Sequence, residues 1–116
     1  MESLVEKSKD VIDESGHPKI SIGLPIYNSE KFIHKRIENL LSQTFTDFEL
    51  IISDNASTDN SVKICKELMK KDSRIKLHLQ EHNIGQFKNF NFVLEQSQGK
   101  YFTWAAADDL LLPKFL

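Results

Sequence analysis

The sequence predicts an α/β fold in which a mostly parallel β-sheet is flanked by helices. Four short segments rich in apolar and β-branched residues, typical of buried strands, alternate with three segments whose apolar residues recur at helical spacing. Strands joined by such helices pair in parallel through right-handed crossovers. The 116 residues are enough for one domain of this kind.

The first 18 residues are predicted to form an N-terminal extension. They are charged, and Gly16-His17-Pro18 separates them from the regular pattern that follows. Four apolar residues at helical spacing leave two alternatives, a loose segment or a short docked helix: Leu4, Val5, Val11 and Ile12. Residues 19–116 are expected to form the first part of a longer domain, because Pro113 is typical of the start of another helix.

The first strand and helix are predicted from residue 20 onward. Residues 20–24 alternate and are β-branched, and Pro25 is expected to end the strand because proline lacks the N–H that a ladder needs. Asn28 or Ser29 is expected to cap a helix over about residues 29–43. Its apolar residues share one face: Ile33, Ile37, Leu40 and Leu41.

Three further strands and two helices are expected in alternation, over residues 48–53, 60–71, 75–79, 86–97 and 101–105. The first of these strands is an apolar run that suits burial on both faces. The helix after it has an inner face of Val62, Cys65, Leu68 and Met69. The last helix is expected to bury Phe87, Phe90 and Leu94, and Gly99 is expected to end it.

Composition and charge exclude several classes of protein. The formal net charge of −2 argues against a broad basic surface for nucleic acid. The single cysteine, Cys65, excludes an intramolecular disulfide and a multi-cysteine metal site. No apolar run approaches the roughly 20 residues of a membrane span, and the polar N-terminus lacks a signal-peptide core. We therefore expect a cytoplasmic protein, and association of the longer parent with the cytoplasmic face of a membrane stays open.

Residues that could bind a ligand or take part in a reaction follow each predicted strand. Open α/β sheets bind ligands beyond the carboxyl ends of their strands, so these residues are expected to converge on one edge. They are Pro25, Tyr27 and Asn28, then Asp54, Asn55, Ser57 and Thr58, then His82, Asn83 and Gly85, then Asp108 and Asp109. A cluster of carboxylates becomes favourable when a cation joins it, so Asp54 is expected to face the same cleft as Tyr27 and Asp108.

Each of these residues also has a structural alternative. The pair Asp108-Asp109 offers hard oxygen ligands for Mg²⁺ or Mn²⁺, and it equally suits the first turn of a helix. Asp54 can form a turn, Tyr27 can pack instead of stacking on a base, and Lys88 can be solvated instead of meeting a phosphate. No GxGxxG or GxxxxGK[ST] pattern occurs, which disfavours dinucleotide and P-loop phosphate sites.

Several short motifs occur in a fixed order along the chain. The first half contains Pro25-Ile26-Tyr27-Asn28, Gln43-Thr44-Phe45 and Asp54-Asn55-Ala56-Ser57-Thr58-Asp59. The second half contains Asn83-Ile84-Gly85, Gly99-Lys100-Tyr101-Phe102, and Asp108-Asp109 followed by Pro113. Together these motifs resemble the family 2 glycosyltransferases, which have the GT-A fold. The resemblance covers residues 19–116.

The resemblance implies the nucleotide-sugar-binding half of a glycosyltransferase, with a UDP-sugar as the expected donor. The residues it implies at the donor are Pro25, Tyr27, Asp54, Asn55, Gly85, Lys88 and Asp108. It implies Mg²⁺ or Mn²⁺ as cofactor, held by Asp108 and shared by Asp109. The chain departs from the family at Ala106, where the first acid of a D-x-D motif would lie, and at Asn55, where a second aspartate is frequent.

The mechanism implied is direct, inverting displacement at the anomeric carbon, as in polysaccharide biosynthesis. A carboxylate base, expected downstream of Leu116, would deprotonate a hydroxyl of an acceptor glycan, lipid or protein. No catalytic residue is therefore assigned, and the chain alone is expected to be inactive. Two rivals are a non-catalytic nucleotide- or protein-binding module and a phosphoacceptor domain. The latter needs an acidic pair where this chain has Tyr27-Asn28.

Overall fold

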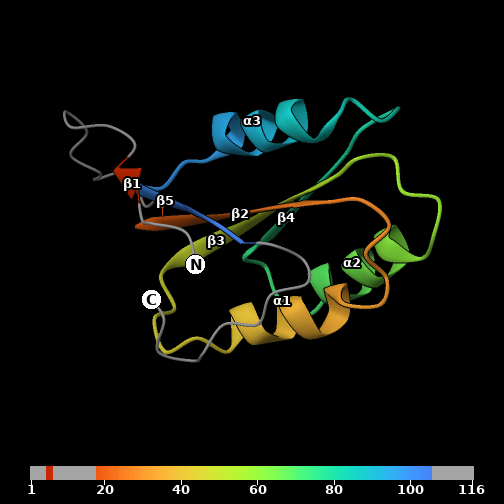
Figure 1. Ribbon diagram of the computed structural model, residues 1–116. Helices are drawn as coiled ribbons and strands as arrows, with labels where there is room; N and C mark the ends of the chain where they lie inside the picture. Colours follow the sequence, from red (N-terminus) through yellow and green to blue (C-terminus); the bar gives the residue numbers. More distant parts are fainter. Residues whose placement is uncertain (1–4, 7–17, 106–116) are drawn as a thin grey trace.

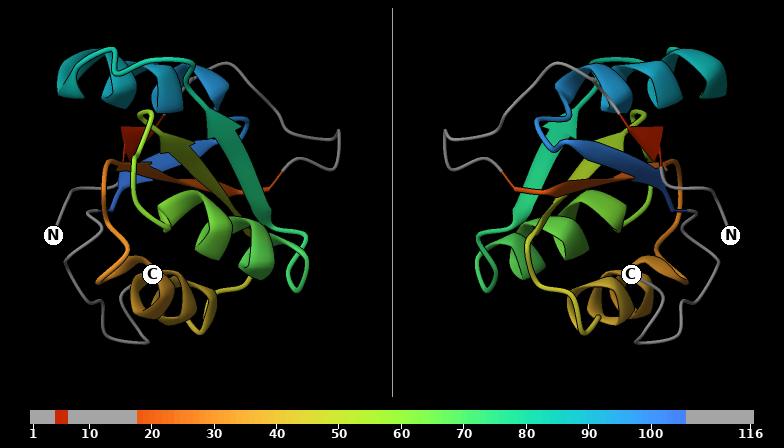
Figure 2. Two further views of the ribbon diagram at one scale, coloured as in Figure 1. Left: turned by 90° about the vertical axis from the view of Figure 1, so that its right-hand side faces the viewer. Right: turned by 90° about the vertical axis from the view of Figure 1, so that its left-hand side faces the viewer.

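The structure, a computed structural model, describes residues 5–6 and 18–105. A β-sheet forms the middle layer, with α3 on one face and α1 and α2 on the other (Figure 1; Figure 2 gives two side views). The elements are β1 (Val5–Glu6), β2 (Ile20–Ile26), α1 (Ile33–Leu41), β3 (Phe48–Asp54), α2 (Ser61–Met69), β4 (Ile75–Leu79), α3 (Gln86–Gln96) and β5 (Tyr101–Trp104). The predicted α/β class is confirmed. Within the described residues, no helix has the length and apolarity that a membrane crossing requires.

The sheet has the strand order β1-β5-β2-β3-β4. The four predicted strands, β2 to β5, pair in parallel, as expected. β1 pairs antiparallel with β5, where Val5 lies opposite Phe102. These two residues are therefore a strand, neither the loose segment nor the helix that the sequence predicted, because β5 offers an edge of unpaired backbone groups. The predictions for residues 1–4 and 7–17 lie outside the described residues.

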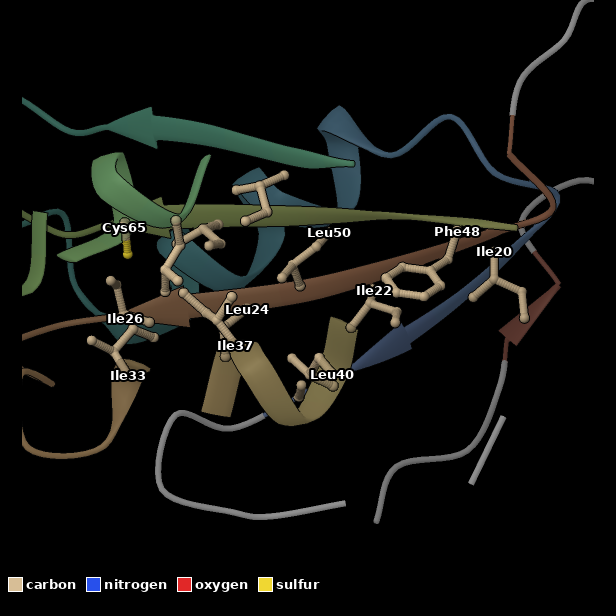
Figure 3. Close-up of a cluster of buried hydrophobic side chains, with 14 residues drawn as sticks. Ile20, Ile22, Leu24, Ile26, Ile33, Ile37, Leu40, Phe48, Leu50 and Cys65 are labelled. Atoms are coloured by element: carbon tan, nitrogen blue, oxygen red, sulfur yellow. The ribbon is translucent and has the colours of Figure 1, made fainter. Parts of the chain in front are cut away.

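The main core lies between the sheet and the helices α1 and α2, as Figure 3 shows. Alternate residues of two strands point toward these helices: Ile20, Ile22, Leu24 and Ile26 from β2, and Phe48, Leu50 and Ile52 from β3. They meet the predicted inner faces, including Ile33, Ile37 and Leu40 of α1 and Cys65 and Leu68 of α2. β3 is buried along its whole length, which confirms the prediction for residues 48–53.

α3 packs closely on the opposite face of the sheet. Its Val93 joins Ile51 and Phe102 in a small apolar cluster. Gly23 on β2 makes this close packing possible. A Cβ at that position would lie 2.5 Å from the Phe102 ring and 2.6 Å from the Val93 side chain. Glycine at residue 23 therefore sets how near α3 comes to the sheet.

The inner face of α3 differs from the predicted one. Phe87 is 78% exposed, whereas Asn89 and Val93, which are four residues apart, are buried. Asn89 is hydrogen-bonded to Ser53 of β3, and this polar anchor sets the rotation of the helix. Phe87 is two residues from Asn89, about 200° around the helix, and so faces outward. The other two predicted residues are partly buried: Phe90 and Leu94.

β2 continues through Pro25 to Ile26, two residues beyond its predicted end. Successive backbone groups of a strand point to opposite neighbours. The carbonyl oxygen of Gly23 accepts the N–H of Ala105 from the β5 side, so Pro25 faces that side as well. β5 has already ended at Trp104, so the missing N–H removes no ladder hydrogen bond.

α1 begins at Ile33, later than predicted, because the residues expected to cap it are used elsewhere. Asn28 has a φ of 48°, and its Oδ1 accepts the backbone N–H of Thr58 in the loop after β3. The chain then makes a turn in which the carbonyl oxygen of Ser29 accepts the N–H of Ile33. Apart from this start, the boundaries of the predicted elements agree with the structure within two residues.

The sequence predicted that Gly99 ends α3, and this prediction is wrong. The helix ends at Gln96, and Gly99 lies against β2, where its N–H donates to the hydroxyl of Ser21. That hydroxyl donates in turn to the buried carboxylate of Glu49, which also accepts the N–H of Gln98. The segment between α3 and β5 is thus tied to β2 and β3 by a chain of hydrogen bonds.

Cys65 is a packing residue of α2. Its side chain is fully buried in the main core. Burial, together with the nearby Asp54 carboxylate, raises the pKa of the thiol to about 12. A thiol in this environment stays protonated and unreactive at neutral pH.

Candidate functional site

A pocket of about 340 Å³ opens at the carboxyl ends of β2, β3 and β5. The strand ends and the loops that follow supply five of its lining residues: Pro25, Ile26, Tyr27, Asn55 and Ala105. α3 and the loop before it supply Asn83, Gln86, Asn89 and Phe90. All of these side chains are uncharged. The pocket lies at the edge of the sheet where open α/β folds bind ligands.

A second cavity, of about 510 Å³, lies beside β4, toward the amino ends of the strands. Glu49, Lys76, His78 and Gln96 are among the residues that border it. It is larger than the first, but it lies away from the carboxyl edge, where the loops that differ among α/β proteins form their sites. The pocket at the carboxyl edge is therefore the candidate site.

Asn55 fixes one wall of the pocket. It is 4% exposed, and its backbone N–H donates to the carbonyl oxygen of Ile26 over 2.9 Å. Its side-chain Oδ1 accepts the N–H of Ile84 over 2.8 Å, and its Nδ2 donates to Oδ1 of Asn83 over 3.0 Å. The same Asn83 oxygen accepts the N–H of Gly85. One asparagine after β3 thereby holds the whole loop between β4 and α3.

Asn89 fixes the opposite wall. Its Nδ2 donates to the carbonyl oxygen of Ser53, and its Oδ1 accepts the Ser53 hydroxyl over 2.6 Å. The Ser53 hydroxyl also accepts Nε2 of Gln80, which lies just after β4. Buried polar groups that satisfy one another in this way favour a single arrangement. α3 is thus held in one rotation over the pocket.

The two loops on the α1 and α2 side of the pocket are joined by hydrogen bonds. Asn28 receives the N–H of Thr58, and its own N–H donates to the hydroxyl of Ser57. The N–H of Ser29 donates to the hydroxyl of Ser61 at the start of α2. These bonds hold Tyr27, a residue that is 48% exposed, at the mouth of the pocket.

Asp59 completes the link between these loops. Its carboxylate accepts the N–H and the hydroxyl of Ser61 and the N–H of Glu30. Slight burial acts to raise the pKa of this carboxyl, but the hydrogen bonds from Ser61 and Glu30 outweigh it and lower the pKa below its usual value. Asp59 therefore serves the loop structure and is not among the residues that line the pocket.

Three of the residues predicted to bind donor line the pocket together: Pro25, Tyr27 and Asn55. Asp54 does not line it. The carboxylate is 2% exposed and accepts both the N–H and the hydroxyl of Ser57. Along β3, Asp54 continues the alternation that turns Leu50 and Ile52 toward α1 and α2, whereas the pocket lies on the α3 side. The expectation that Asp54 faces the same cleft as Tyr27 is therefore wrong.

The remaining predicted residues are not gathered in the pocket. Gly85 is exposed and precedes α3 with a φ of 89°, and Lys88 is exposed on that helix. Asp108 and Asp109 lie outside the described residues. In residues 5–6 and 18–105 no group of three or more His, Cys, Asp or Glu side chains could hold a metal ion.

Six lining residues were not among the residues predicted at the donor: Ile26, Asn83, Gln86, Asn89, Phe90 and Ala105. Asn83 was expected at the carboxyl edge after the third predicted strand, but it was not assigned to the donor. The sequence did contain a signal for Asn89. It lies one helical turn before Val93, so it shares the helix face that packs on the sheet and is buried there. A prediction that considers only the residues following each strand misses side chains of a helix that packs over the strand ends.

Comparison with known proteins identifies the family. The model of the family described as glycosyl transferase family 2 matches residues 21–116. A protein of Haemophilus influenzae named as an uncharacterized glycosyltransferase is 38% identical over 94 residues, which is 81% of this chain and 38% of that protein. Glycosyltransferase GlyG of Streptococcus pneumoniae is 36% identical over 92 residues, which is 79% of this chain and 31% of that protein. The chain spans well under half the length of these relatives.

Solved structures share the fold of the chain. Staphylococcus aureus TarS 1-349 in complex with UDP superposes with a TM-score of 0.77 and 31% identity, over 83% of this chain and 29% of that one. Mannosyltransferase PcManGT from Pyrobaculum calidifontis, in complex with GDP-Man and Mn²⁺, gives 0.75 at 23% identity, over 87% of this chain and 31% of that one. This chain belongs to glycosyl transferase family 2 and has the GT-A fold.

Proposed function

We propose that the pocket binds the base and ribose of a UDP-sugar, and that the longer protein transfers the sugar to an acceptor hydroxyl with inversion. The observation that carries the proposal is the position of the pocket, at the carboxyl ends of three parallel strands in a family 2 chain. Further support comes from TarS, a structure 31–32% identical to this chain, whose complexes contain UDP and UDP-GlcNAc.

Three lining residues, and Asp54 outside the pocket, have roles in this proposal. The half-exposed ring of Tyr27 offers a face on which a base can stack. Pro25 and Asn55 border the same space from β2 and β3. Asp54 holds the loop after β3 through its hydrogen bonds to Ser57, and it affects donor binding only indirectly, by positioning that loop.

The proposal assigns the divalent cation, Mg²⁺ or Mn²⁺, to Asp108 and Asp109. Two adjacent carboxylates are hard oxygen ligands of the kind these ions take, and the rest of the shell comes from water and phosphate. Asp108 follows Ala105, which lines the pocket, by three positions along the chain. A bound cation would offset the charge that develops on the departing diphosphate.

A second candidate is a donor- or protein-binding module without transfer activity. Ala106 favours it, because alanine stands where the first acid of the family's metal motif would lie. The catalytic base is assigned to the part of the longer protein beyond Leu116. Sugar transfer by the longer protein, measured with metal and with chelator, separates the two candidates.

Titration calorimetry with UDP tests the donor site and the metal together. UDP should bind this chain more tightly with Mn²⁺ than with chelator, because the diphosphate completes the ion's shell, and metal and nucleotide should raise each other's affinity equally. Asp108→Asn should remove that dependence on Mn²⁺. Asp47→Asn, an exposed carboxylate at the amino end of β3, should leave it unchanged.

Two outcomes would contradict the assignment. Equal UDP affinity of wild type and Asp108→Asn, with Mn²⁺ and with chelator, would mean that Asp108 is no metal ligand. Loss of the Mn²⁺ dependence in Asp47→Asn as well would mean that net charge, and not a site, produces the effect.

A further inference from the structure

The outer face of α2 carries a row of three exposed lysines: Lys63, Lys66 and Lys70. The buried residues of this helix are Ser61, Cys65 and Leu68. At about 100° of rotation per residue, the three lysines lie within about 60° of one another, on the side opposite the buried residues. The row is about 10 Å long, close to one Debye length at physiological ionic strength, so its charges act together.

The protein does not neutralise this lysine row. In the described part of the chain, the ion pairs join His34 to Glu38 and Arg74 to Asp72, and none involves the row. Residues 63–71 contain four lysines and one glutamate, a net charge of +3, whereas the whole chain carries −2. The rest of the chain therefore carries −5. The positive charge is local to one helix of an otherwise acidic protein.

The stability of the helix does not account for the row. Cations are favourable near the carboxyl end of a helix, which suits Lys66 and Lys70, but Lys63 lies in the first turn, where a cation is unfavourable. The other two long helices have exposed residues of both signs. α1 carries Lys35 and Glu38, and α3 carries Lys88 and Glu95. A one-sided basic face distinguishes α2 from α1 and α3.

The shape and surroundings of the lysine row determine which anionic partner fits it. None of its lysines lines the pocket at the carboxyl edge or the cavity beside β4, and the outer side of a helix is convex, so a small anion finds no concave site there. A nucleic acid extends past the row along a surface of net negative charge, which repels it. A planar membrane of anionic lipids touches one face of the protein only.

We infer that α2 rests on an anionic membrane surface, with Lys63, Lys66 and Lys70 facing the lipid phosphates. α2 belongs to the layer on one side of the sheet, and α3 covers the other side, so α3 faces away from the lipid (Figure 1). Each lysine near such a surface strengthens binding roughly fivefold. The attraction is electrostatic, so added salt weakens it.

Sedimentation of the 116-residue chain with vesicles tests the inference. The chain should bind vesicles of equal parts phosphatidylcholine and phosphatidylglycerol, and not vesicles of phosphatidylcholine alone. The double variant Lys66→Gln/Lys70→Gln should bind the anionic vesicles about twentyfold more weakly, because it removes two charges from the row. Lys19→Gln/Lys76→Gln removes the same charge from exposed positions outside the helices, and its binding should stay within about twofold of wild type.

Glu67→Gln gives the opposite change, an increase in affinity that misfolding cannot imitate. Glu67 is the exposed carboxylate beside the lysine row, so its removal should tighten binding to the anionic vesicles about fivefold. Glu95→Gln is the matched control. It changes the net charge equally from an exposed position on α3, on the other side of the sheet, and should leave the affinity near wild type.

Four results would overturn the inference. They are no binding to the anionic vesicles, equal binding to both kinds of vesicle, equal losses in the two lysine double variants, and binding to duplex DNA of random sequence as tight as to the anionic vesicles. The third would mean that net charge produces the effect, and the fourth that the row attracts any polyanion. Tighter binding in Glu67→Gln than in Glu95→Gln, with a large loss in Lys66→Gln/Lys70→Gln alone, supports the inference.

Discussion

Gly99→Ala should lower the free energy of unfolding by about 3 kcal/mol, as overpacking against backbone does. A Cβ at residue 99 would lie 2.7 Å from the backbone nitrogen of Ser21 and 2.8 Å from the carbonyl carbon of Ile20. β2 is paired on both sides at these residues and cannot withdraw. The shift would also pull Gly99 N and Gln98 N from their hydrogen bonds to Ser21 and Glu49.

Gly85→Ala is the matched control for this change. A Cβ at Gly85 would meet nothing within 4 Å, so the only penalty is its φ of 89°. With its ψ of 154° this is a conformation that glycine almost alone adopts, and it costs an L-residue about 1–3 kcal/mol. Urea unfolding followed by circular dichroism should therefore rank Gly99→Ala as the more damaging variant. If Gly99→Ala unfolded at the wild-type midpoint, the close contact between residue 99 and β2 would be wrong.

Asn55→Ala should lower the affinity for UDP by about tenfold or more, because a site whose supporting shell loosens loses its geometry. The change removes both side-chain bonds that hold the loop before α3, to Ile84 N and to Asn83 Oδ1. It also leaves a backbone N–H without its acceptor, which costs about 1–3 kcal/mol of stability. The titration is run well below the melting temperature, so that lost folding does not pass for lost affinity.

Asn91→Ala on the outer face of α3 is the control for Asn55→Ala. It removes the same side chain from an exposed position outside the pocket and should leave both stability and UDP affinity near wild type. Unchanged UDP affinity in Asn55→Ala would show that the loop between β4 and α3 does not shape the site.

The sequence predicted those helices and strands in which the spacing of apolar residues alone determines which side chains are buried. Ile33, Ile37 and Leu40 repeat at helical spacing and all reach the core. The buried face of α3 was predicted wrongly because Asn89, a polar residue, takes the inward position. Its hydrogen bonds to Ser53 depend on a strand 36 residues away in the sequence. The extension of β2 past Pro25 likewise depends on where β5 ends, which no local pattern records.

The candidate site was predicted in part for a similar reason. The rule that ligands bind beyond the carboxyl ends of strands found Pro25, Tyr27 and Asn55. It could not tell the two faces of the sheet apart, so it included Asp54, which points toward α2. It also overlooked Phe90 because the rule considers loops and not the helix that lies over them.

The central claim is that the pocket at the carboxyl edge, and not the larger cavity beside β4, receives the nucleotide. Two-dimensional ¹⁵N–¹H spectra of the chain, recorded during a UDP titration, test it most directly. The account predicts saturable shifts of the side-chain amides of Asn55 and Asn83 and the backbone amide of Tyr27, with Lys76 and Gln96 unchanged. Shifts confined to Lys76, Gln96 and their neighbours, with the Asn83 amide unmoved at saturation, would contradict it.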